Sequence, residues 1–152
     1  MIRTSMSMTP GRPFRSNPIL HSQLRGGLAG YYNASDQYSK TVFPFSNERE
    51  IIYMDINSPL DSEAYLGTLT HELQHAIHWT SDSSEETWVN EGLSEVAKGL
   101  VGYEMSFIDY FTKLPTTSLT AWPLGNVSSR EHYGAASLFI EYLAQHLSLI
   151  HI

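Results

Sequence analysis

The sequence contains no cysteine among its 152 residues. This absence excludes a disulfide framework, an iron–sulfur cluster and a zinc site built on thiolates. Any metal ion that this chain binds must therefore be held by histidine and carboxylate side chains. The absence says little about the cellular compartment, because many secreted proteins contain no disulfide bond.

Positive charge is also scarce, since 9 Lys and Arg residues face 16 Asp and Glu residues and the formal net charge is −7. This balance argues against a nucleic acid or an anionic membrane as partner. No apolar run approaches the roughly 20 residues that a membrane span needs. The first twenty residues are polar, contain three arginines and lack the apolar segment of a secretion signal. We therefore expect either an intracellular protein or a part of a longer secreted precursor.

Several catalytic and binding patterns are missing as well. There is no Gly-x-Ser-x-Gly nucleophile motif and no phosphate-binding glycine loop. No acidic loop has the calcium-binding pattern, although a structural calcium ion could still be bound by Asp36, Asp55, Asp61 or Asp82. These absences give no support to a serine or cysteine nucleophile or to a phosphate-binding loop.

The length suits one domain with one hydrophobic core. Residues 1–28 are rich in Ser, Pro, Gly and Arg, and we expect an irregular lead-in or the remnant of a missing N-terminal region. Residues 29–152 would form the folded domain, complete or truncated. Hydrophobic periodicity predicts strands at 29–33 and 50–56, an ordered loop at 36–50, and helices at 62–79, 86–103, 105–114 and 130–147. Strands followed by helices predict an α+β fold.

The predicted helix 62–79 contains the pattern His-Glu-x-x-His at His71, Glu72 and His75. Residues four apart lie on one helix face, so the two imidazoles can bind one zinc ion at roughly 2.0–2.1 Å. Glu72 would project beside the metal and move a proton from water to a leaving amine. The alternative is a solvated polar helix face. The strand directly before the helix favours a peptidase cleft, because an extended substrate can pair with a strand.

A catalytic zinc site usually has three protein ligands and one open position. His78 lies about 10 Å along the helix axis from His71, which is too far for one unbroken helix to serve a single ion. We interpret His78 as a packed or supporting histidine. Glu91 is the better third ligand, because the predicted helix 86–103 can run antiparallel and point it back at the metal. Glu95 lies on the same face and can accept the other N–H of a ligand histidine. Two solvated glutamates on a surface helix are the alternative.

The two helical motifs, His71-Glu72-x-x-His75 and Asn90-Glu91-x-x-x-Glu95, resemble those of the gluzincin metallopeptidases. The stretch 30–142 is also similar to the immune inhibitor A-like and hyicolysin-like secreted bacterial peptidases, at 30–32, 46–50, 71–79, 86–95 and 132–135.

The resemblance implies a zincin-like fold over 29–152, with short strands, an active-site helix and a mostly helical C-terminal part. It also implies one zinc ion per chain, Asn90 beside the ligands, endopeptidase action on peptides or proteins, and an extracellular location. Gluzincins use a Tyr or His from the C-terminal part to stabilise the oxyanion. His132 and Tyr133 open the last predicted helix, and Tyr133 is the first choice because a phenol donates without being charged. Packing of Tyr133 against the helix pair is the alternative.

The sequence therefore predicts a zinc endopeptidase with Glu72 as general base and acid. Two other interpretations stay open. One is a zinc-binding but catalytically incomplete fragment, and the other is an interaction domain without a metal. A zinc aminopeptidase ranks lower, because no motif offers a carboxylate for the N-terminal amine of a substrate. Substrate preference and oligomeric state have no sequence signal.

Overall fold

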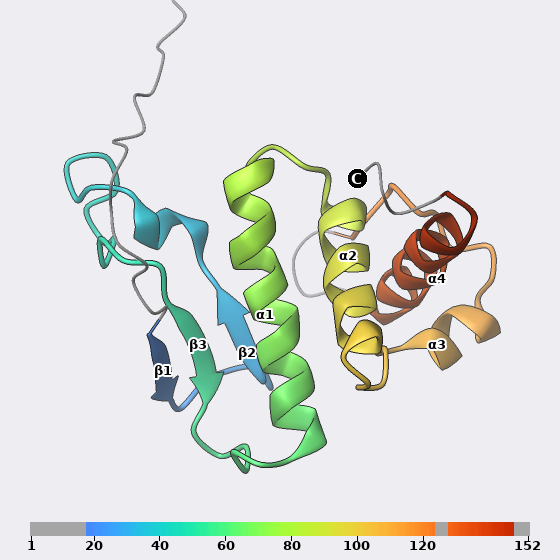
Figure 1. The fold of residues 1–152 in the computed structure, drawn as a ribbon, viewed down its shortest axis with the longest axis horizontal. Helices are drawn as coiled ribbons and strands as arrows, with labels where there is room; N and C mark the ends of the chain where they lie inside the picture. Colours follow the sequence, from blue (N-terminus) through green and yellow to red (C-terminus); the bar gives the residue numbers. More distant parts are fainter. Residues whose placement is uncertain (1–17, 124–127, 148–152) are drawn as a thin grey trace, which may run out of the picture.

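The structure, a computed structural model, describes residues 18–123 and 128–147. Within these ranges, a three-stranded sheet lies against the first α-helix, and the other helices follow on the far side of that helix (Figure 1). This order confirms the α+β class. None of the helices in the described ranges is long and apolar enough to cross a lipid bilayer.

The sheet has the strand order β1–β3–β2. The central strand β3 (Ile52–Asp55) pairs in parallel with β1 (Ile19–Ser22) and antiparallel with β2 (Gly30–Tyr32). The strands predicted at 29–33 and 50–56 are thereby confirmed. β2 forms the edge of the sheet nearest to the first helix (Figure 1).

The expectation of an irregular segment over 1–28 is wrong for β1, whereas residues 1–17 lie outside the described residues. β1 exists because Ile19 pairs with Ile52 of β3, which is far away in sequence. Three of the four strand residues are exposed, so no buried face marks the strand by alternation. A short edge strand of this kind depends on its partner rather than on its own pattern.

The core joins the sheet to α1 (Glu63–Ser81). Ile52 and Met54 are almost fully buried and form a cluster with Tyr65. The Ser62 hydroxyl begins the helix by accepting the backbone N–H of Tyr65 at 3.1 Å. The helix predicted at 62–79 is confirmed, and its position is fixed by this core.

The segment between β2 and β3 is ordered around a buried carboxylate, as predicted for 36–50. Asp36 lies in a short 3₁₀ helix, η1 (Ala34–Gln37). It accepts hydrogen bonds from the Tyr53 hydroxyl at 2.7 Å and the Asn47 backbone N–H at 2.9 Å. Asp36 therefore has a structural role that ties this segment to β3.

α2 (Thr87–Leu100) follows α1 after a short polar loop and runs antiparallel to it (Figure 1). The predicted helix 86–103 is thereby confirmed with a slightly earlier end. The antiparallel arrangement turns one face of α2 towards the face of α1 that carries the two histidines. This pairing brings the two sequence motifs together.

α3 (Ile108–Lys113) and α4 (Arg130–His146) complete the described fold and confirm the last two predicted helices. α4 packs closely on α2 at Gly92, where an added Cβ would lie 2.9 Å from the Ala136 carbonyl oxygen. It approaches the start of α3 even more closely at Gly134, where an added Cβ would lie 2.4 Å from the Phe107 carbonyl oxygen. These two glycines let α4 pack closely on α2 and on the start of α3.

Candidate metal centre

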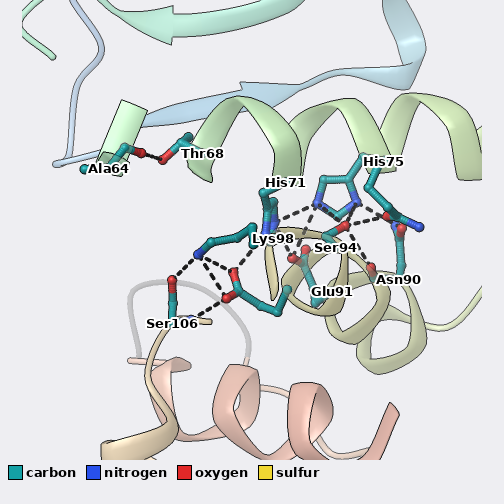
Figure 2. Close-up of polar contacts among 11 residues, drawn as sticks. Ala64, Thr68, His71, His75, Asn90, Glu91, Ser94, Lys98 and Ser106 are labelled. Carbon is teal, nitrogen blue, oxygen red and sulfur yellow. Dashed lines mark hydrogen bonds and ion pairs between the residues drawn. The ribbon is translucent and has the colours of Figure 1, made fainter. Parts of the chain in front are cut away.

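Three side chains from two helices converge on one point. His71 and His75 lie one turn apart on α1, and Glu91 reaches them from α2 (Figure 2). The His71 Nε2 atom is 3.1 Å from Glu91 Oε2 and 3.0 Å from His75 Nε2. His75 Nε2 is 3.4 Å from the same carboxylate oxygen. The three atoms therefore form a nearly equilateral triangle.

This triangle has the dimensions of three ligands on one tetrahedral metal ion. Ligand atoms at roughly 2.0–2.1 Å from a tetrahedral zinc ion lie about 3.3 Å from one another. The three measured separations of 3.0, 3.1 and 3.4 Å agree with that spacing. Among the residues that the structure describes, this is the only group of three or more His, Asp or Glu side chains suited to hold a metal ion. The other aspartates considered for calcium are not gathered in such a group.

The outer nitrogens of the two histidines have fixed partners. His71 Nδ1 lies 2.9 Å from Glu95 Oε1, and His75 Nδ1 lies 2.9 Å from Asn90 Oδ1 (Figure 2). A carboxylate and an amide oxygen only accept hydrogen bonds, so each Nδ1 carries the proton. The lone pairs of both Nε2 atoms then face each other. Such a pair repels unless a proton or a metal ion lies between the two atoms, which is the arrangement of ligand histidines in zinc sites.

The electrostatics agree with a site prepared for positive charge. Burial alone would lower the pKa of His71, but hydrogen bonds to Glu91 and Glu95 prevail and raise it to about 9. Burial alone would raise the pKa of Glu91, but its hydrogen bonds with His71 and His75 hold that pKa at about 2. The metal-free site therefore holds a proton where a metal ion would replace it.

Glu72 lies beside the triangle, between α1 and β2. It is 7 % exposed, and burial raises the pKa of its carboxyl group against the opposing charges of His71 and His75. The backbone N–H of Tyr32 in β2 hydrogen bonds to its carboxylate. A shielded carboxyl group with a raised pKa holds a proton more readily than an exposed glutamate, which suits a group that must accept and then release one.

The Tyr32 contact follows from the register of the sheet. The Asp55 N–H donates to the Ala29 carbonyl at 2.9 Å, which makes these two residues a hydrogen-bonded pair. Hydrogen-bonded and non-bonded pairs alternate along an antiparallel ladder, so Gly30 and Tyr32 direct their backbone polar groups away from β3. The free edge of β2 therefore faces the helix that carries the histidines.

Tyr133 is brought to the site, whereas its neighbour His132 is not. The Tyr133 hydroxyl lies close to Glu91, and the centre of its ring is 6.3 Å from that of His71. Burial and the nearby carboxylates raise the Tyr133 pKa, so the phenol keeps its proton. His132 instead donates from Nδ1 to the Ser118 carbonyl at 2.9 Å and packs against Trp122. Of the two predicted oxyanion donors, only Tyr133 contacts the triangle.

His78 lies outside the triangle, as expected for one unbroken helix. Its Nε2 atom is buried without a hydrogen-bond partner among the described residues, 3.9 Å from Glu85 Oε2. It lines a cavity of about 270 Å³ together with Tyr32, His75 and Glu91. His78 is thus a wall residue of a cavity that also contacts His75 and Glu91.

Two residues that support the site, Ser94 and Lys98, were not among those predicted from the sequence. Ser94 is fully buried, donates to Gln74 Oε1 at 2.6 Å, and lies 3.1 Å from His75 Nδ1. Lys98 is 7 % exposed and lies 3.0 Å from Glu95 Oε2. Their spacing of three and seven residues from Glu91 places them on one helical face with it, which could have singled them out.

Comparisons with protein-family models, curated proteins and solved structures found no match for this chain. The geometry of the site therefore carries the functional argument.

Proposed function

We propose that this chain is a zinc-dependent endopeptidase of the gluzincin type with a zincin-like fold. The observation that carries the proposal is the triangle of His71 Nε2, His75 Nε2 and Glu91 Oε2, with separations of 3.0 to 3.4 Å. Imidazole nitrogens with one carboxylate oxygen are the donor set of catalytic zinc sites. An extracellular location belongs to the same proposal, because it comes from the same resemblance.

A zinc ion held by these three residues would supply a Lewis acid that polarises the scissile carbonyl and makes water acidic. Glu72 is the base that takes a proton as the water oxygen bonds to the carbonyl carbon. Glu72 then gives that proton to the nitrogen of the leaving amine as the carbon–nitrogen bond breaks. The Tyr133 hydroxyl, still protonated, donates a hydrogen bond to the oxygen that becomes negative.

The free edge of β2 favours the proposal that the substrate is a peptide. Gly30 and Tyr32 direct their backbone polar groups away from β3, and an extended peptide would pair by β-strand addition with those groups that Glu72 does not already contact. An added Cβ at Gly30 would lie 2.9 Å from Thr68 Cγ2 of α1. The absence of a side chain there allows the close approach of strand and helix that frames the cleft.

The decisive experiment replaces Glu72 with Gln. The amide keeps the shape of the side chain but cannot take a proton. We expect hydrolysis of casein to fall by about 10²–10⁴-fold, with zinc still bound at one ion per chain. The matched control is Glu63→Gln, an exposed position at the start of the same helix, which should change neither quantity.

Each outcome separates the proposal from its alternatives. Casein cleavage by Glu72→Gln at the wild-type rate would reject Glu72 as the base. Wild-type protein with bound zinc and no turnover on any peptide library would favour a zinc-binding module without catalysis. Protein that binds no zinc at all would favour an interaction domain.

A further inference from the structure

The buried lysine Lys98 contacts Glu95, the carboxylate that accepts a hydrogen bond from His71. Lys98 Nζ lies 3.2 Å from Glu95 Oε1 and 3.0 Å from Glu95 Oε2, so it contacts both carboxylate oxygens (Figure 2). Lys98 also hydrogen bonds to the Ser106 hydroxyl, and the Ser106 backbone N–H donates to Glu95 Oε2. Glu95 in turn accepts the His71 Nδ1 proton at 2.9 Å.

These contacts form one chain of hydrogen bonds from the segment after α2 to the proposed metal ligands. The segment is turned back at Gly102, whose φ of +92° suits glycine, and the Tyr103 N–H donates to the Lys98 carbonyl at 2.9 Å. This turn brings Ser106 to Glu95. The position of Glu95 is therefore fixed from α2 and from the following segment together.

Because both charges are buried, the Glu95–Lys98 ion pair is sensitive to the loss of either partner. Glu95 is 3 % exposed and Lys98 is 7 % exposed, so both charges are largely shielded from water. Removal of one partner from a buried ion pair leaves an uncompensated charge, which is much less favourable than an intact pair. Without Lys98, the Glu95 carboxylate would lose the group that bridges both of its oxygens and would be free to turn away. That change weakens the acceptor that holds His71 Nδ1.

We propose that Lys98 is a positioning residue of the metal centre, which holds Glu95 against His71 and thereby keeps His71 Nε2 directed at Glu91 and His75. The inference rests on the proposed function, because it assigns Lys98 a role towards the zinc ligands. This positioning role differs from a purely structural role because it predicts an effect on metal binding. A lysine that only tied the segment 103–107 to α2 would affect stability and leave metal binding unchanged.

The experiment measures the zinc dissociation constant of the full chain by competition with a chromophoric chelator. Lys98→Met keeps the apolar stem and removes the charge. We expect zinc affinity to fall by about 10-fold or more, as for other residues that orient a ligand histidine. Lys98→Arg should stay within roughly a factor of three of wild type, because guanidinium also bridges both carboxylate oxygens. A cavity of about 480 Å³ beside Lys98 and Ser106 offers room for the larger group.

The matched control is Lys113→Met. It removes a lysine from an exposed pair with Asp109, whose side chains are 73 % and 64 % exposed, and zinc affinity should not change. The visible spectrum of the cobalt-substituted protein provides a second readout. We expect Lys98→Met to alter the cobalt absorption bands and Lys113→Met to leave them as in wild type.

Circular dichroism of the metal-free variants shows whether the fold is retained at the temperature of the assay. If Lys98→Met does not fold, Ser106→Ala replaces it, since that change removes only the hydroxyl contact of Lys98 and keeps the backbone bond to Glu95. A folded Lys98 or Ser106 variant with wild-type zinc affinity and cobalt spectrum would overturn the inference alone. Wild-type protein without zinc affinity would overturn the proposed function, and the inference with it.

Discussion

Single residues in this site act mainly through the hydrogen bonds that orient them. Glu95 and Asn90 accept from the Nδ1 atoms of the two histidines, and this sets the direction of both Nε2 atoms. Carboxylate and amide acceptors of this kind raise the basicity of a ligand imidazole and fix its ring. Glu95 and Asn90, which lie outside the triangle, therefore determine the direction of the two Nε2 atoms within it.

The role of Tyr133 can be tested by the removal of a single hydroxyl group, which leaves all three atoms of the triangle in the chain. We expect Tyr133→Phe to lower kcat by about 10²-fold, because removal of one donor to a developing oxyanion has a cost of this size. Zinc affinity should fall less than kcat, because the hydroxyl is not one of the three triangle atoms and Glu91 keeps its contacts with His71 and His75. Stopped-time peptide hydrolysis and zinc titration measure the two quantities.

The control for Tyr133 is Tyr142→Phe, on the same helix and 54 % exposed, which should behave as wild type. An unchanged kcat in Tyr133→Phe would return Tyr133 to a packing role. A loss of zinc affinity equal to the loss of activity would instead show that the hydroxyl serves only to hold Glu91.

At the scale of helices and strands, the site depends on close approaches of backbones. α1 and α2 supply the three side chains of the triangle, and α4 adds Tyr133. Gly134, next to Tyr133, has no room for a Cβ, because the Phe107 carbonyl oxygen lies 2.4 Å from that position. The glycine is therefore required by packing and not by backbone freedom.

Replacement of Gly134 by Ala should move α4 away from the start of α3. We expect a loss of about 1–3 kcal/mol in the free energy of unfolding, because overpacking of this kind outweighs the gain in helix propensity of about 1 kcal/mol. Urea unfolding of the metal-free protein measures it. Gly67→Ala on α1 is the control, since its Cβ would meet Lys98 Cε at an ordinary 3.5 Å, and it should be neutral or stabilising. Equal stability of both variants would contradict this account of α4.

For the whole molecule, local patterns predicted most elements, because α1, α2 and α4 have long amphipathic repeats. They did not predict β1, whose parallel partner Ile52 is distant in sequence. The spacing of His71, Glu72 and His75 identified one face of one helix. The approach of Glu91 and the choice of Tyr133 over His132 depend on how α2 and α4 pack, and the burial of Lys98 appears only once Ser106 is folded back. Hydrophobic periodicity therefore predicts the helices, whereas tertiary packing determines which of their side chains meet at the site.

Protonation of residues in the site should change the folding stability of the whole molecule. His71 has a pKa of about 9 in the folded protein against 6.5 for the free side chain, so its contribution is complete below about pH 6.5 and is lost as the pH rises through 9. Glu91, with a pKa of about 2 against 4.5, contributes above pH 4.5 and loses that contribution as the pH falls through 2. Metal-free protein should therefore be most stable between about pH 4.5 and 6.5.

Bound zinc should oppose the loss of folding stability that the metal-free protein shows as the pH rises above about 6.5. Zinc competes with the proton on His71, so the stability that zinc adds must grow as the pH rises from 6.5 to 9. Urea unfolding at a series of pH values, with zinc and with a chelator, measures both curves. His71→Gln should remove the decline of the metal-free curve and most of the zinc effect, whereas His146→Gln, at an exposed position, should keep both. Parallel curves with and without zinc across this range would mean that zinc does not replace the proton at His71, and the triangle would then be a proton-linked ion pair only.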